Sequence, residues 1–135
     1  MLIEDTLAAF GHETGLGPLA LTEDAPLRLS LSEHEELVFE CCPDGILLHL
    51  DIRVRYDMPL VLASALQRIA TDGATPHPVQ VGMRETPEGT WLIVGTRADA
   101  STFTLQWIEQ TTAYLERWIG ALRSDYPDSF DGPFR

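Results

Sequence analysis

His49 and Asp51 are the two residues whose types and spacing come nearest to acid–base chemistry in this sequence. They stand two positions apart in Ile46–Ile52, where apolar residues alternate with others. This alternation predicts a strand, and residues two apart on a strand share one face. An imidazole beside a carboxylate is a possible general acid–base pair. The same pair also suits the polar outer face of a half-buried sheet, and that is the interpretation we adopt.

The other residues capable of chemistry form no recognisable constellation. His12 and Glu13 are adjacent, so on a helix they point in different directions and make a poor metal site. No cation lies near Cys42 in the sequence to lower the pKa of its thiol. P-loop, G-x-G-x-x-G, G-x-S-x-G and H-E-x-x-H motifs are absent from the sequence. We therefore predict no catalysis, no bound metal and no cofactor.

The composition excludes two classes of partner. The 135 residues carry a net charge of −12, and all nine basic residues are arginine. So acidic a chain is a poor binder of nucleic acid or anionic membrane surfaces. It contains no apolar run long enough to span a membrane, and the first ten residues lack the basic region of a signal peptide. The adjacent Cys41 and Cys42 suit a reducing cytosol.

Hydrophobic periodicity and turn signals predict eight elements in one domain. A first helix runs from Leu2 to about Thr14, and a last helix, capped by Asp99 or Ser101, ends near Arg123. The other elements are three strands between residues 27 and 52, a central helix at 59–70, and two strands near 79–84 and 91–96. The order α-β-β-β-α-β-β-α indicates an α+β fold, a mostly antiparallel twisted sheet with helices packed on it. Residues 1–125 form the domain, and residues 126–135, rich in Pro, Gly and Asp, form a flexible tail.

The central helix is more apolar than one core contact requires. Its apolar arc covers about 200°. One interpretation is scattered surface leucines on a mid-chain helix. The interpretation we adopt is packing against a second copy of the chain. The predicted homodimer interface contains Leu60, Val61, Ser64 and Arg68, joined by Val79 and Val81 of the following strand.

The order of elements, together with size and acidity, resembles the class I type III secretion chaperones (the CesT/Tir chaperone family). The resemblance covers Leu2 to about Leu122. It rests on the opening helix leading into Phe10–Leu21, on Leu27–Leu31, on the hairpin around Pro43-Asp44-Gly45, on Met58–Leu66, on Trp91–Gly95 and on the closing helix with Trp118. The absence of lysine and the Arg53-Val54-Arg55 segment have no counterpart in the resemblance.

The resemblance implies a cytoplasmic homodimer in a Gram-negative bacterium. Such a dimer binds the N-terminal chaperone-binding segment of a secreted effector in extended form and keeps it secretion-competent. The secretion ATPase or export apparatus is a further implied partner. Extended peptides are held by apolar pockets and by strand addition at sheet edges. The chain has apolar faces beyond the needs of one core, which is typical of a protein that binds another protein.

Seven positions outside the expected core are candidates for effector binding. They are Leu2, Thr6, Leu29, Leu31, Leu47, Trp91 and Ile93, although Leu29 and Leu31 are equally compatible with the core. Acidic residues such as Glu4, Asp5 and Glu40 are expected to steer a basic client. Two other functions stay open. One is a non-secretion adaptor or regulatory binding domain of the same fold, and the other is a small cone-shaped isomerase or hydratase using His49 and Asp51.

Overall fold

The computed structural model describes residues 3–71 and 78–130. The elements are α1 (Ile3–Thr14), β1 (Leu27–Ser32), β2 (Glu35–Cys42), β3 (Gly45–Val54), α2 (Met58–Thr71), β4 (Gln80–Thr86), β5 (Gly89–Asp99) and α3 (Leu105–Asp125). This is the α-β-β-β-α-β-β-α order that the sequence predicted. Among the described residues, no helix combines the length and apolar character needed to cross a bilayer.

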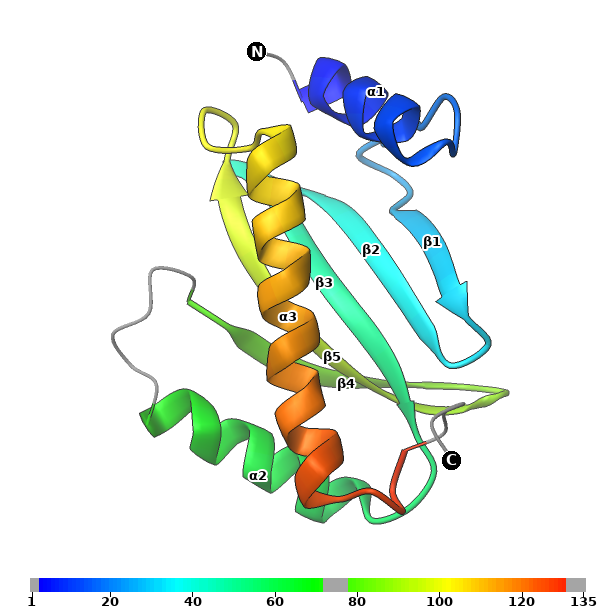
Figure 1. Cartoon of the computed structure of the whole chain (residues 1–135), viewed down its shortest axis with the longest axis vertical. Coiled ribbons are helices and arrows are strands. Elements are labelled where there is room, and N and C mark those ends of the chain that lie inside the picture. Colours follow the sequence, from blue (N-terminus) through cyan, green and yellow to red (C-terminus); the bar gives the residue numbers. More distant parts are fainter. Residues whose placement is uncertain (1–2, 72–77, 131–135) are drawn as a thin grey trace.

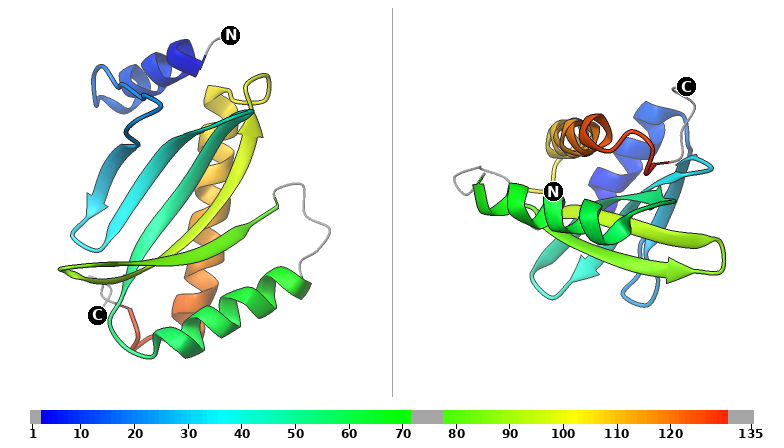
Figure 2. Two further views of the ribbon diagram at one scale, coloured as in Figure 1. Left: turned by 180° about the vertical axis from the view of Figure 1, so that it is seen from behind. Right: turned by 90° about the horizontal axis from the view of Figure 1, so that it is seen from below.

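The five strands form one antiparallel sheet in the order β1-β2-β3-β5-β4. Helix α3 crosses one face of this sheet, α1 lies at the end where β1 begins, and α2 lies beside β4 (Figure 1). Seen from behind, the sheet stands in front of α3 and twists strongly, so that β4 runs at a steep angle to the first three strands (Figure 2). We call the face toward α3 the inner face and the opposite face the outer face.

The core lies between the inner face and the helices. Alternation along β3 turns Ile46, Leu48, Leu50 and Ile52 toward α3, where all four are buried. Helix α3 packs against them with apolar residues at helical spacing. Those buried are Trp107, Ile108, Leu115, Trp118, Ile119 and Leu122. Phe39 joins the two layers through ring contacts with Phe10 and Phe103, at centroid distances of 5.7 and 6.2 Å.

The start of α3 differs from the sequence prediction. Asp99 and Ser101 do not cap it, because the Asp99 carboxylate accepts hydrogen bonds from Ser101 and Thr102 in the preceding turn. Thr104 is the N-cap, and its hydroxyl accepts a hydrogen bond from the Trp107 backbone N–H at 3.0 Å. Helix α3 therefore begins later than predicted, and it ends at Asp125 rather than near Arg123.

The first half of the expected tail is packed. Phe130 is fully buried in the core, and it forms an isolated antiparallel bridge with Val54 at the end of β3. Just beyond that strand, the Arg55 backbone N–H donates to the Ser129 carbonyl at 2.7 Å. The segment is rich in Pro, Gly and Asp, and the sequence does not show which of its three aromatic residues, Tyr126, Phe130 and Phe134, packs on the core. Residues 131–135 of the expected tail lie outside the described residues.

Replacing Phe130 by alanine should therefore lower the free energy of unfolding by about 3 kcal/mol, because the lost contacts leave a cavity. Thermal or urea unfolding measures this change. The matched control is Tyr126→Ala, which truncates a half-buried aromatic residue of the same segment and should cost less. Equal stability of the Phe130→Ala variant and the parent chain would show that the segment contributes nothing to the core.

Candidate functional site

The outer face carries a network of six charged side chains from four strands. Its members are Arg28 of β1, Glu36 and Glu40 of β2, His49 and Asp51 of β3, and Arg84 of β4. They meet because each occupies an outward position of its strand, and because pairing places β2 beside β3. Part of the network is deeply buried, which is unusual for the helix-free face of a sheet.

His49 is the centre of the network and contacts a carboxylate with each ring nitrogen. Its Nδ1 faces Asp51 Oδ1, and its Nε2 lies 2.5 Å from Glu40 Oε2. Burial of the ring is the largest single influence and lowers the pKa of His49, but the hydrogen bonds and charges of Asp51 and Glu40 together outweigh it. The pKa of His49 is therefore raised above its ordinary value. Both nitrogens donate only when the ring is protonated, so the geometry also fits an imidazolium.

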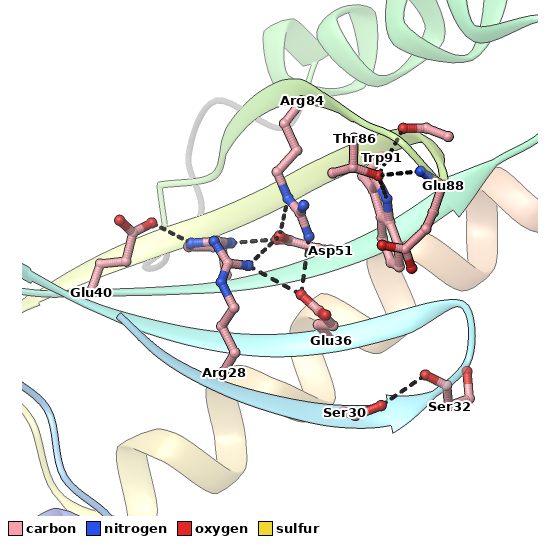
Figure 3. Close-up of polar contacts among 12 residues, drawn as sticks. Arg28, Ser30, Ser32, Glu36, Glu40, Asp51, Arg84, Thr86, Glu88 and Trp91 are labelled. Atoms are coloured by element: carbon pink, nitrogen blue, oxygen red, sulfur yellow. Dashed lines mark hydrogen bonds and ion pairs between the residues drawn. The ribbon is translucent and has the colours of Figure 1, made fainter. Parts of the chain in front are cut away.

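Asp51 connects His49 to the two arginines. It is fully buried, and its Oδ2 accepts a hydrogen bond from Arg84 Nε at 3.0 Å. Arg84 Nη2 also donates to Glu36 Oε1 at 3.0 Å, and Arg28 Nη1 donates to the same oxygen at 3.1 Å. The two guanidinium groups approach Asp51 and Glu36 from opposite edges of the sheet (Figure 3). Such charge-assisted contacts are the stronger class of hydrogen bonds.

Two neighbours shape the space around the network. Gly95 pairs with His49 across β3 and β5, and a Cβ atom on it would lie 2.6 Å from the His49 Cβ. A glycine is therefore required where the imidazole lies over the sheet. On the other side, the Arg84 guanidinium stacks on the Trp91 ring, 4.9 Å from its centroid.

This arrangement is a poor catalytic site. The structure does bring His49 and Asp51 together, but only 3% of His49 is exposed and both of its nitrogens already have partners. No nitrogen is left to accept a proton from a substrate. Within the described residues, no group of three or more His, Cys, Asp or Glu side chains is placed to hold a metal ion.

A cleft of about 430 Å³ opens beside the network, between the tips of the β1–β2 and β4–β5 hairpins. The hydroxyl groups in its wall are engaged within the protein. Ser30 donates to the Ser32 carbonyl, and Thr86 accepts from Trp91 Nε1 and from the Glu88 backbone N–H (Figure 3). The remaining wall is mostly charged, with the exposed carboxylates Glu33 and Glu88 at the two hairpin tips.

The second unusual surface is the exposed side of α2. Leu60 and Leu66 are 58% and 51% exposed, and Met83 of the neighbouring β4 is 42% exposed. Ala63 and Ala70 are also exposed on this helix. Its 14 residues include no Asp or Glu, although the chain as a whole carries a charge of −12. We call Leu60, Ala63, Leu66, Ala70 and Met83 the α2 patch.

The structure separates the predicted dimer residues. Leu60 lies in the α2 patch, whereas Val61 is fully buried in the core of its own chain and is not an interface residue. Arg68 is tied to α3, with its guanidinium 5.9 Å from the Trp118 ring centroid and 3.5 Å from Asp125. Ser64 lines a shallow hollow with Arg68, and Val79 and Val81 are half-buried against the core.

The predicted effector-binding residues do not form one groove. Thr6 is buried and donates its hydroxyl hydrogen to the Phe103 carbonyl at 3.2 Å, and Trp91 is buried beneath Arg84, so neither is a surface position. Leu29 packs against the core from the inner face, and Leu31 next to it is exposed. The half-buried Leu47 and Ile93 lie on the outer face, while Leu2 lies outside the described residues.

The sequence does not predict that Arg28, Glu36 and Arg84 belong to the network. Each lies at a polar position of an alternating strand, and this alternation alone predicts that the three side chains share the outer face. The contacts between them depend on the strand order β1-β2-β3-β5-β4 and on the strong twist of the sheet, which turns β4 across the first three strands. Neither property can be read from alternation alone.

Comparisons with known proteins show relatives by fold only. No family model matches the chain, and no curated protein matches it by sequence. A chain of the ExsC–ExsE complex superposes with a TM-score of 0.66 and 20% identity, covering 90% of this chain and 91% of that one. A chain of the ExoU–SpcU complex of the Pseudomonas aeruginosa type III secretion system superposes with a TM-score of 0.56 and 20% identity. That match covers 90% of this chain and 94% of the other.

YbjN from E. coli, crystallised as a candidate transcription regulator, shares the fold as well. Its TM-score is 0.60 at 16% identity, and the match covers 98% of this chain and 100% of that one. At these identities the matches establish fold and not role. The chain thus has the fold of the class I type III secretion chaperones, as its sequence resemblance predicted.

Proposed function

We propose that this protein is a type III secretion chaperone of the bacterial cytoplasm. As a homodimer it binds the N-terminal segment of a secreted effector in extended form, without catalysis, and keeps that segment soluble until export. The observation that carries the proposal is the fold match over about nine tenths of the chain to proteins crystallised in chaperone–effector complexes. The secretion ATPase or export apparatus is the proposed recipient of the client.

The surface of the chain supports this proposal in two ways. The α2 patch is apolar and free of carboxylates, so two copies can approach there without the like-charge repulsion expected elsewhere on so acidic a chain. Leu31 at one edge and Leu47 and Ile93 on the outer face remain accessible after folding. Extended clients use such separated apolar sites together with exposed strand edges, and here β1 and β4 are the edge strands of the sheet.

A second candidate is an adaptor or regulatory binding domain outside secretion. The match to YbjN, complete over both chains, favours it. The two functions differ in the partner and not in the fold. A partner that is exported, and that binds through its N-terminal region, identifies the secretion chaperone.

Exchanging Leu47 or Ile93 for aspartate should weaken effector binding about tenfold in each case, because a charge replaces apolar area that the client covers. Titration calorimetry with the N-terminal segment of the protein encoded beside this chain measures the loss. Gln80→Glu is the matched control, since it adds one negative charge to an exposed outer-face position without removing apolar area. Full affinity in both aspartate variants, with circular dichroism showing intact folding, would place the client elsewhere.

A further inference from the structure

The six charges of the outer-face network cancel only when His49 is protonated. Arg28, His49 and Arg84 then carry three positive charges, and Glu36, Glu40 and Asp51 carry three negative ones. Loss of the His49 proton leaves one uncompensated negative charge and one ring nitrogen with a lone pair facing a carboxylate. The charged ring of His49 can therefore donate to both carboxylates, whereas the neutral ring can donate to only one of them.

The two carboxylates are unequal in their access to water. The Asp51 side chain is fully buried, whereas the Glu40 side chain is 42% exposed. A buried carboxylate that loses a donor pays the full cost of desolvation, while an exposed one is hydrated instead. The proton at Nε2, which faces Glu40, is therefore the one that leaves. The neutral ring keeps its proton on Nδ1 and continues to donate to Asp51.

Arg97 is a second cation on the outer face, and it lies on the strand beyond Leu47 from Glu40. Glu40 pairs in register with Leu47 across β2 and β3, and Leu47 pairs with Arg97 across β3 and β5. All three side chains occupy outward positions, and Arg97 is exposed. The remaining charged groups near His49 are Arg28, Glu36 and Arg84, which act through Asp51. Val38 and Gly95, its neighbours in register, carry no charge.

We propose that Glu40 is a proton-controlled arm, held by His49 when the imidazole is charged and transferred to Arg97 when it is neutral. In the second position the ion pair crosses above Leu47. Leu47 is thus uncovered at lower pH and covered at higher pH. Any consequence for effector binding rests on the proposed function, whereas the exchange of partners is a property of the chain alone.

Nitrogen-15 NMR of the histidine rings between pH 5.5 and 9.5, on the full chain without a client, tests the first step. We expect His49 to titrate at higher pH than an ordinary histidine side chain, because Asp51 and Glu40 favour the charged ring. A histidine in an unstructured model peptide, recorded under the same conditions, serves as the reference. The neutral form should show the proton on Nδ1, and the Glu40 carboxyl carbon-13 shift should change with the midpoint of His49. In Glu40→Gln the midpoint of His49 should fall, with the neutral tautomer unchanged.

Crystal structures at pH 6 and pH 9.5 test the second step. The carboxylate of Glu40 should contact His49 in the first and Arg97 in the second. A His49 midpoint at or below that of the reference peptide, a neutral form protonated on Nε2, or a Glu40 carboxylate that stays on His49 at pH 9.5 would each overturn the proposal. None of these measurements involves a client, so their failure is separate from a failure of the chaperone function.

Discussion

Replacing Asp51 by alanine is expected to lower the free energy of unfolding by about 4 kcal/mol at neutral pH. The Asp51 side chain is fully buried, faces His49 Nδ1 and accepts a hydrogen bond from Arg84 Nε at 3.0 Å. Its removal leaves two positively charged groups next to each other without their shared counter-ion. Breaking a buried ion pair by deleting one partner typically costs 3–5 kcal/mol, a larger loss than exposed pairs produce.

Urea unfolding of the variant measures this loss, and Glu109→Ala is the matched control. Glu109 is an exposed carboxylate on α3, so its removal should change stability by less than about 0.5 kcal/mol. The variant should also lower the pKa of His49, because the carboxylate that stabilises the imidazolium is gone while burial remains. A stability loss as small as that of the control would show that the network is not a structural unit.

Replacing Leu60 by aspartate should convert the proposed homodimer into a monomer. Leu60 is 58% exposed in the single chain, and it stands on a helix without carboxylates. Burying a leucine at an interface contributes about 1.5–3 kcal/mol, and a charge placed there adds a desolvation cost. The dissociation constant should therefore rise about 100-fold.

Sedimentation equilibrium across micromolar concentrations measures the dimer. The control is Leu16→Asp, which places the same charge on a leucine that is 53% exposed but lies in the loop after α1. It should leave the dissociation constant unchanged. A parent chain that is monomeric at these concentrations, or a Leu60→Asp variant that dimerises as tightly as the parent, would remove α2 as the interface.

The element order was predictable because each element carries its own local signal. The alternation of Ile46, Leu48 and Leu50 and the helical spacing around Trp118 each fix one element without information from the rest of the chain. The turn at Pro43-Asp44-Gly45 joins two strands that pair with each other, so this register could also be expected. These signals together placed the fold class.

The network and the packed end of the chain were not predictable, because they depend on contacts between distant segments. Arg84 meets Glu36 across 48 positions of sequence, and Phe130 meets Val54 only because α3 returns the chain to the end of β3. Thr6 was expected at the surface, but α1 turns it toward the Phe103 carbonyl. Helical periodicity gives the relative direction of two side chains, and it leaves open which neighbour covers them.

Isothermal titration of the purified protein with the N-terminal segment of the secreted protein encoded beside it tests the central claim most directly. We predict saturation at one segment per two chains and a negative change in heat capacity, because an extended client buries apolar area as it becomes ordered. The same titration with the remainder of that secreted protein should show no binding. Absence of binding by the N-terminal segment, or equal binding by the remainder, would contradict the chaperone account.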